Sequence, residues 1–387
     1  MTERVVFGEP WFGDEEQQLV AETIASRWIG QGPLVERFER ELASYLEASA
    51  VVAVSSCTAA LHLSLLVAGV GPGHEVITTP MTFVATINAI EYTGATPVLV
   101  DVDPVSLLLR PEDVDAAITV RTRAVVPVSF GGRPLDIDGY LQIIRGRGIW
   151  VIEDAAHSIG AVACGQRVGS DRDDHYITCF SFYPNKNVAS AEGGAIAIAD
   201  TDLAGRLRMM RLHGLDIDAW DRYQGDDYAP SLALVAGYKY NWTDLQAAIA
   251  IPQLERIEGF LAIRRYLASQ YDELLREVPQ VAAVARGEHG LRTVHALHLY
   301  QVRVPGSRRD RVVARMRSEG VGAAVHYVGV NLHPRFRHLE AQSLPNSDSA
   351  SKELISLPLH PGISVDDACR VIDSLKRSVT LEPASVS

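Results

Sequence analysis

The strongest constraint on the fold is an alternation of short apolar runs with helical segments between residues 50 and 200. The apolar runs are rich in β-branched residues and nearly continuous, as in VVAVS, EVITT, TPVLVD, RAVVPVSF and IWVIED. Helical patterns separate most of them, at 58–69, 82–94, 111–117 and 135–146. Strands of this kind, joined through helices, are typical of a mainly parallel sheet that helices cover on both faces. We therefore predict an α/β protein whose large domain is built around such a sheet.

The C-terminal third has a different pattern. A long helical segment over 243–277 is capped at Thr243, and Pro252 is expected to bend it. A strand, a helix and further short elements follow it. We predict a large domain over residues 1–250, which includes a helical N-terminal segment. A smaller α+β domain is predicted over residues 251–387, with the long helix as the link.

Composition narrows the possible functions. The chain has 387 residues, 47% of them hydrophobic and 22% charged, as in soluble globular proteins. A formal net charge of −12 argues against a nucleic-acid partner, because phosphate backbones require clustered Lys and Arg. No apolar run is long enough to cross a bilayer, and the acidic N-terminus does not resemble a signal peptide. The four cysteines are scattered and no metal-ligand spacing occurs, so we expect no metal and a cytoplasmic location.

Several residues that could react or bind a ligand lie at the ends of the predicted strands or just after them. Ligands of open α/β sheets bind there. Lys186 lies in the turn-rich segment SFYPNK, and Asp154 ends the run IWVIED, where an unpaired carboxylate is unfavourable. Phe83 follows the run EVITT, and the helix that starts near Thr58 offers free amides to an anion. A lysine for a Schiff base, a carboxylate, a ring-covering aromatic and an anion site are the parts of a pyridoxal phosphate site.

Ordered motifs along nearly the whole chain identify a resemblance. They include VSSCTAALHLSL (54–65), VITTPMTFVATINAI (76–90), VIEDAAHSIGA (151–161), SFYPNKNVASAEGG (181–194), GYKYNWTDLQAAIA (237–250) and SLPLHPG (356–362). The sequence resembles the DegT–StrS family of pyridoxal-phosphate-dependent nucleotide-sugar aminotransferases. The resemblance implies the fold-type I aminotransferase architecture.

The resemblance also implies roles for matching residues. Lys186 matches the Schiff-base lysine, and Asp154 matches the partner of the pyridine nitrogen. His157 matches the residue that hydrogen-bonds the cofactor's phenolic oxygen, and Phe83 matches the aromatic that stacks on the ring. The matches for phosphate binding are Thr58, Ala59 and Ser181.

The GYKYN segment is similar to the one that reaches into the partner subunit's site in this family. The resemblance therefore implies a homodimer with shared active sites, in which Lys239 and Asn241 act across the interface.

The motifs AVSSxTA, EDAAH, HGLxxDAxDR and GYKYN are most similar to those of family members that act at carbon 4 of a sugar. The implied reaction moves the amino group of L-glutamate to the 4-keto group of a nucleotide-linked sugar. Such substrates are dTDP- or UDP-4-keto-6-deoxyhexoses and UDP-4-keto-pentoses, aminated through the pyridoxal and pyridoxamine phosphate forms of the cofactor. The substrate-side candidates are Tyr183, Ser129, His326 and Tyr327. Tyr183, Ser129 and Cys57, which precedes Thr58, differ from the residues usual at these positions in the family.

Other functions remain open at this point. They are a 3-keto-sugar aminotransferase, a branch of the family that aromatises a cyclic precursor, and a non-catalytic regulator or binding module. A dehydratase branch carries histidine in place of the lysine, so Lys186 argues against it. Lys186, Asp154 and Ser181 together argue against a loss of catalysis.

Overall fold

A computed structural model describes residues 4–216, 230–286, 293–304, 306, 308–339 and 343–380. The end of the HGLxxDAxDR motif, beyond Asp216, lies outside these residues.

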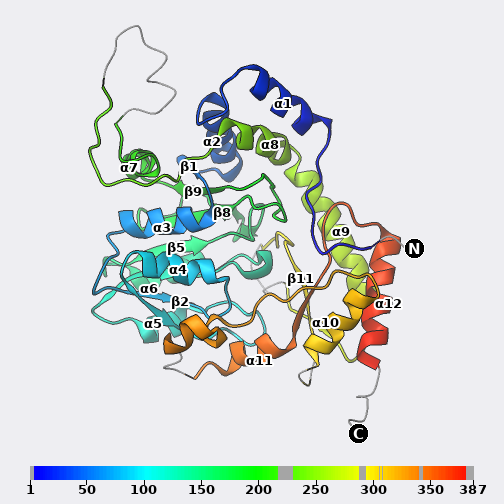
Figure 1. Ribbon diagram of the computed structural model, residues 1–387. Coiled ribbons are helices and arrows are strands. Elements are labelled where there is room, and N and C mark those ends of the chain that lie inside the picture. The colour runs from blue at the N-terminus through cyan, green and yellow to red at the C-terminus, as the bar shows by residue number, and fades with distance from the viewer. Residues whose placement is uncertain are drawn as a thin grey trace.

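The core of the protein is a seven-stranded sheet in the order β1-β9-β8-β5-β4-β2-β3 (Figure 1). Its strands are β1 (Ala50–Val54), β2 (Glu75–Thr78), β3 (Thr96–Leu99), β4 (Thr122–Val126), β5 (Trp150–Asp154), β8 (Tyr176–Ser181) and β9 (Gly194–Ile198). The pairs β2–β3, β2–β4, β4–β5 and β5–β8 are parallel, while β9 is antiparallel to both of its neighbours. The predicted mainly parallel sheet is confirmed.

Helices cover both faces of this sheet, as the near-continuous apolar strands predicted. Val52 and Val54 of β1 pack in one core with α3, α4 and α7, whereas Val51 and Ala53 pack in another with α2 and α8. A third core joins the sheet to α5 and α6, and α1 packs along α8. The bounds of these helices are α1 (Asp14–Ala25), α2 (Pro33–Leu46), α3 (Cys57–Val67), α4 (Val84–Tyr92), α5 (Pro111–Ala117), α6 (Ile137–Ile144), α7 (Thr201–Arg211) and α8 (Asp244–Glu255). None of the helices in the described ranges is both long and apolar enough to cross a membrane.

The C-terminal elements form a smaller layer with its own core. A three-stranded antiparallel sheet in the order β10-β11-β12 packs with α9, α10 and α12. The elements are α9 (Ile257–Leu275), β10 (Ala282–Ala283), β11 (Tyr300–Arg303), α10 (Arg309–Ser318), α11 (Pro345–Glu353), β12 (Leu354–Leu357) and α12 (Val365–Thr380). Short 3-10 turns lie at Phe130–Gly132, Val330–Leu332 and Pro334–Leu339, and β6 (Val162–Ala163) pairs with β7 (Gln166–Arg167). The expected boundary between residues 250 and 251 falls inside α8 and remains a prediction.

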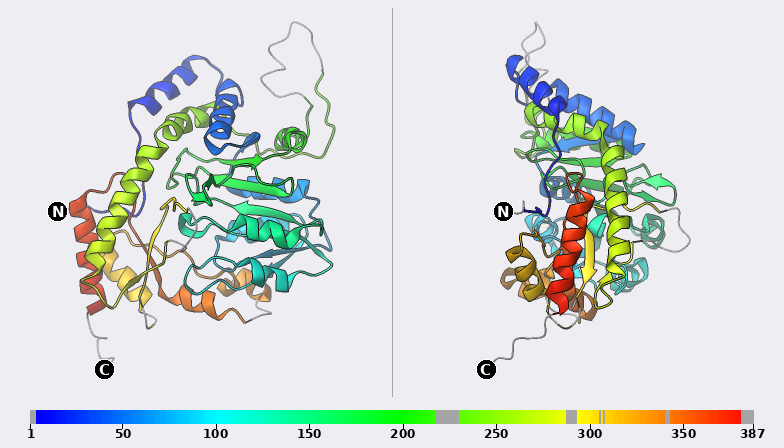
Figure 2. Two further views of the ribbon diagram at one scale, coloured as in Figure 1. Left: turned by 180° about the vertical axis from the view of Figure 1, so that it is seen from behind. Right: turned by 90° about the vertical axis from the view of Figure 1, so that its right-hand side faces the viewer.

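The long predicted helix is present as two helices. Thr243 caps α8 by accepting a hydrogen bond from the N–H of Gln246 at 3.3 Å, as expected. The helix is interrupted at Arg256 (φ −98°, ψ 3°) and not at Pro252. Pro252 lies inside α8, although its nitrogen cannot donate a hydrogen bond. The helix α9 then runs from the N-terminal helices to the C-terminal elements (Figure 2).

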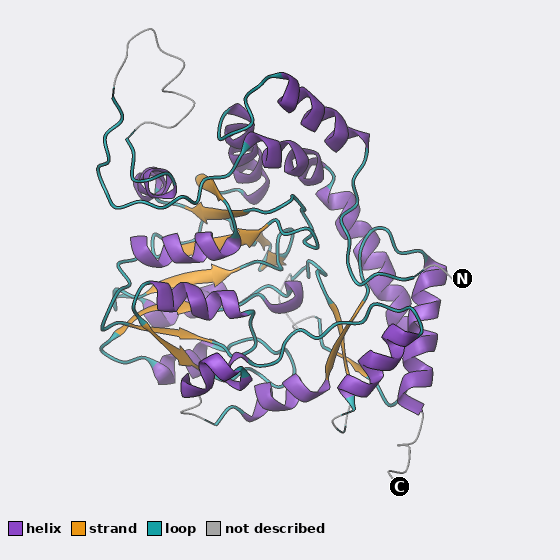
Figure 3. Ribbon diagram, in the orientation of Figure 1, coloured by secondary structure: helices purple, strands orange, loops and turns teal. Residues whose placement is uncertain are grey.

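The arrangement of the two parts positions a site. The parallel strands point toward the C-terminal strands and helices, so the loops after them lie between the two parts of the protein (Figure 3).

Candidate active site

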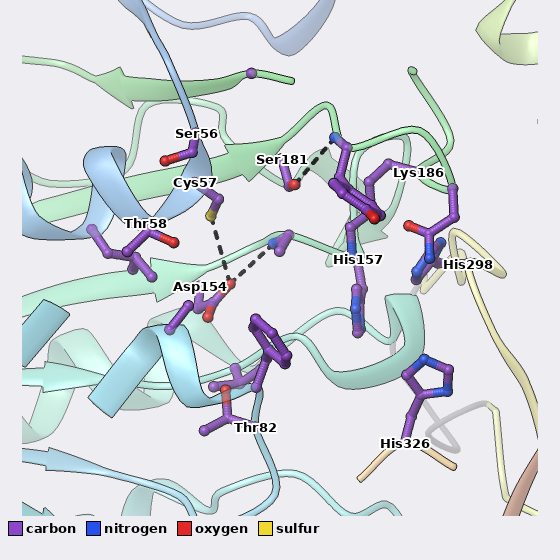
Figure 4. Close-up of a pocket in the computed structure, with 18 of the residues that line it drawn as sticks. Ser56, Cys57, Thr58, Thr82, Asp154, His157, Ser181, Lys186, His298 and His326 are labelled. Atoms are coloured by element: carbon purple, nitrogen blue, oxygen red, sulfur yellow. Dashed lines mark hydrogen bonds between the residues drawn. The ribbon is translucent and has the colours of Figure 1, made fainter. Parts of the chain in front are cut away.

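A cavity of about 470 Å³ lies at the carboxyl ends of β1, β5 and β8 (Figure 4). Asp154 ends β5, Ser181 ends β8, and α3 begins directly after β1. The predicted site residues that line the cavity are Thr58, Phe83, Asp154, His157, Ser181, Tyr183, Lys186, His326 and Tyr327. The structure therefore brings together residues that are spread over most of the chain.

Lys186 enters the cavity from the turn between β8 and β9. Its backbone N–H donates to the carbonyl of Tyr183 at 2.8 Å, which closes the turn. Within the described part of the chain, its amine has no hydrogen-bond or ion-pair partner. Burial lowers the pKa of Lys186 to about 8, although the neighbouring Cys57 and Asp154 act in the opposite direction. At pH 7 roughly a tenth of this amine is therefore unprotonated, far more than for an ordinary lysine.

Asp154 lies on the cavity wall, 6% exposed. Burial is the largest effect and leaves the pKa of its carboxyl group above the usual value, although hydrogen bonds from Thr86 and Ala156 and the charge of Lys186 act in the opposite direction. The Thr86 hydroxyl donates to Oδ2 at 2.8 Å, and the backbone N–H of Ala156 donates to Oδ1 at 3.2 Å. These donors favour the ionised form of a carboxylate that is removed from bulk water.

His157 is neutral and has a defined tautomer. Burial, together with the charges of Lys186 and His326, holds the pKa of His157 well below its usual range. The N–H of Gly131 donates to its Nδ1 at 3.2 Å. The ring proton is therefore on Nε2, which lies 3.1 Å from the hydroxyl oxygen of Tyr327.

The N-terminus of α3 provides an anion site. Ser56 caps the helix by accepting a hydrogen bond from the N–H of Ala59 at 3.1 Å. The other amides of the first turn have no partner inside the helix, and the helix dipole favours negative charge there. The hydroxyl groups of Thr58 and Ser181 lie on the same cavity wall (Figure 4).

Phe83 is the N-cap of α4 and is 58% exposed. An aromatic side chain that only filled the core would be buried, so its ring is free to cover a flat ligand.

Comparison with known proteins decides the family. A model of the DegT/DnrJ/EryC1/StrS aminotransferase family matches residues 10–376. The spore coat polysaccharide biosynthesis protein SpsC of Bacillus subtilis (strain 168) is 40% identical over 376 residues, which cover 95% of both chains. The chain belongs to the DegT/DnrJ/EryC1/StrS aminotransferase family.

Solved structures of similar sequence share the fold. DesV of S. venezuelae superimposes with a TM-score of 0.88 at 32% identity, covering 99% of this chain and 100% of that chain. Spr1654 of Streptococcus pneumoniae, described as a sugar aminotransferase, has been solved with pyridoxal phosphate. That form superimposes with a TM-score of 0.88 at 28% identity, covering 97% of this chain and 98% of that chain. The predicted family, fold type and cofactor are confirmed, and the protein is a pyridoxal-phosphate-dependent aminotransferase.

The cavity of this DegT/DnrJ/EryC1/StrS member suits that cofactor. It combines an amine of lowered pKa, a buried carboxylate, an exposed aromatic ring and a helix N-terminus. The start of α3 lies close against the backbone of β9. A Cβ on Gly194 of β9 would lie only 2.6 Å from the nitrogen of Cys57. The donor set therefore matches a flat, phosphorylated aldehyde.

Four predicted residues do not line this cavity. The N–H of Ala59 is engaged by the Ser56 side chain. Ser129 is fully buried, and its hydroxyl donates to the buried carboxylate of Glu153. The remaining two, Lys239 and Asn241, lie in the segment before α8, and Lys239 is exposed.

Sequence reasoning missed other cavity residues of this family member. Thr82 lines the cavity and its hydroxyl contacts the hydroxyl of Thr86. The two threonines are four residues apart in TPMTFVAT, and this spacing predicts that they lie on one face of a helix. His298 also lines the cavity, is 5% exposed, and has an Nδ1 without a hydrogen-bond partner in the described residues. It precedes β11 and carries no local signal of function.

Proposed function

We propose that the protein transfers the amino group of L-glutamate to the 4-keto group of a nucleotide-linked sugar. The observation that carries this proposal is the placement of Lys186 and Asp154 on one cavity of an aminotransferase fold. Relatives support the sugar class, because Spr1654 is described as a sugar aminotransferase and SpsC as a polysaccharide biosynthesis protein. Position 4 rests on the similarity of the motifs EDAAH and GYKYN to those of 4-aminotransferases.

Each role follows from the chemistry of a side chain. Bound pyridoxal phosphate supplies an electron sink for the bonds of an amino-bearing carbon. Lys186 is assigned the covalent attachment and the transfer of protons, for which a partly unprotonated amine is required. Asp154 supplies the negative charge that faces the pyridine nitrogen, and Phe83 covers the ring. His157 is assigned the hydrogen bond to the phenolic oxygen, for which its Nε2 proton would turn from the hydroxyl oxygen of Tyr327 to the cofactor.

The phosphate group requires more positive charge than one chain offers. Lys186 is the only Lys or Arg among the described residues that line the cavity, while Asp154 and Glu192 contribute negative charge. Amides and hydroxyls at Thr58 and Ser181 leave a phosphate with close to two negative charges uncompensated. We propose that Lys239 of a second subunit compensates that charge, with Asn241 beside it, in a homodimer with shared sites.

The cavity wall opposite α3 favours an uncharged polar substrate group. It carries His298 and His326, and burial lowers the pKa of both, that of His326 to about 4. Together with Tyr183 and Tyr327, these side chains present neutral hydrogen-bonding groups. Such a wall can donate hydrogen bonds to and accept them from the hydroxyl groups of a sugar ring.

A substrate panel tests the proposal. Purified protein loaded with pyridoxal phosphate is incubated with glutamate and with 4-keto and 3-keto nucleotide sugars, and the products are identified by mass and NMR. We expect amination at carbon 4 and none at carbon 3. Amination only at carbon 3, or of no sugar at all, would contradict the assignment. Lys186→Ala serves as the control. It should abolish turnover, and borohydride should no longer attach the cofactor covalently to the protein.

A further inference from the structure

A hydrogen-bonded chain of two hydroxyls ends on the carboxylate in the cavity wall. Oγ1 of Thr86 lies 2.8 Å from Oδ2 of Asp154 and 2.7 Å from Oγ1 of Thr82. Thr86 is 1% exposed and Thr82 is 2% exposed, so water does not compete for these hydroxyls. The two threonines flank the start of α4, which places them one helical turn apart.

The direction of the protons along this chain follows from the hydrogen bond that the Thr86 hydroxyl donates to Asp154. A carboxylate only accepts hydrogen bonds, so the single hydroxyl proton of Thr86 points to Asp154. The oxygen of Thr86 then accepts, and Thr82 must be the donor. Each hydroxyl therefore has one orientation, and protonation of Asp154 would disturb both.

We propose that Thr86 is a positioning residue that holds Asp154 as an ionised carboxylate at a fixed place on the cavity wall, and that Thr82 orients Thr86. This inference rests on the proposed function, in which Asp154 faces the pyridine nitrogen. It adds the residues that keep Asp154 charged and in place for that role.

Other groups act on the same carboxylate. Oδ1 accepts the N–H of Ala156 at 3.2 Å and lies 4.0 Å from the thiol of Cys57. The ionisable groups coupled to Asp154 are Cys57, Glu153, Cys179, Lys186 and Tyr327. Replacing Thr86 changes none of these charges, so it isolates the hydrogen bond.

The test follows the titration of Asp154 in the full-length protein without cofactor. Aspartate labelled with ¹³C at the carboxyl carbon is observed by NMR, and Asp154→Asn identifies the signal. Thr86→Val should raise the midpoint of Asp154 by about one to two pH units, since hydrogen bonds to charged groups are worth that much. Thr86→Ser retains the hydroxyl and should return the midpoint to near the wild-type value. Thr82→Val should give a smaller rise.

Thr93→Val is the matched control, because its buried hydroxyl at the end of α4 donates to the carbonyl of Ile90 and not to Asp154. A midpoint in Thr86→Val that equals the midpoint in Thr93→Val would overturn the proposal. If Thr86→Val does not fold, an unchanged midpoint in Thr82→Val would overturn it instead.

Cofactor binding separates this inference from the proposed function. Pyridoxal phosphate is titrated into the same variants, and its affinity and absorbance spectrum are recorded. If Asp154→Asn bound the cofactor with wild-type affinity and spectrum, the proposed role of Asp154 would fail. A midpoint shift in Thr86→Val would still support the threonine chain.

Discussion

The hydroxyl oxygen of Tyr327 lies 3.1 Å from Nε2 of His157, a residue 170 positions earlier in the chain. Because Nδ1 of the same ring accepts the N–H of Gly131, the proton on Nε2 is donated to Tyr327. The C-terminal part of the protein thus holds the orientation of a ring that belongs to the cavity of the central sheet.

Replacing Tyr327 with Phe removes this acceptor and should leave the N–H of His157 unpaired. We expect the free energy of unfolding to fall by about 0.5–1.5 kcal/mol, measured by urea denaturation of the cofactor-free protein. Tyr92→Phe is the control, because Tyr92 is 59% exposed and its hydroxyl has no hydrogen bond in the described residues. Equal stability of the two variants would contradict the hydrogen bond.

The amine of Lys186 should react at lower pH than an ordinary lysine. Burial lowers its pKa from 10.5 to about 8, so acylation of Lys186 in the cofactor-free protein should reach half its maximal rate near that pH. Mass spectrometry of labelled peptides measures the rate. A midpoint near 10 would refute the shift.

The same shift predicts how stability depends on pH. Between about 8 and 10.5 the unfolded chain binds the proton of Lys186 and the folded chain does not. The contribution of Lys186 to the free energy of unfolding should therefore rise with pH across this window. Lys186→Met should lack that contribution in urea denaturation curves recorded at several pH values.

Gly194 should tolerate no side chain. A Cβ at this position would lie 2.5 Å from the carbonyl carbon of Ser56 and 2.6 Å from the nitrogen of Cys57. Gly194→Ala should push the start of α3 away from the sheet, lower stability by about 1–3 kcal/mol, and weaken the binding of pyridoxal phosphate.

The control for this substitution lies in α7. A Cβ on Gly205 would meet nothing within 4 Å, and Gly205→Ala should raise stability by about 0.5–1 kcal/mol through helix propensity. Urea denaturation and cofactor titration of both variants give the comparison. Cofactor affinity in Gly194→Ala equal to that of the wild type would show that the helix start does not hold the phosphate.

Subunit mixing tests the shared site. An inactive Lys186→Ala chain is combined with an inactive Lys239→Glu chain under conditions that exchange subunits. In the mixed dimer one site carries both defects, while the other has an intact Lys186 and an intact Lys239. Partial recovery of activity is expected. No recovery despite proven mixed dimers would mean that Lys239 serves its own chain.

Local patterns in the sequence predicted most of the elements and several of the residues that line the cavity. The β-branched runs became β1, β2, β3, β4 and β5, because continuous apolar strands need cover on both faces. Asp154 and Lys186 were recognisable as candidates because Asp154 ends a strand and Lys186 lies in the turn after one, where an open α/β sheet binds ligands. The cap at Thr243 was predictable because it depends on its neighbours in the chain.

Contacts between distant residues were decided by the tertiary structure alone. The order β1-β9-β8-β5-β4-β2-β3 is not the order of the chain, and it brings α4 beside β5, so that Thr86 reaches Asp154 over 68 residues. The same packing buries Ser129 against Glu153, away from the cavity where we had expected it. It also places His298 on the cavity wall. A hydrophobic pattern specifies which face of an element is buried, but the partner of each polar group depends on which elements pack together.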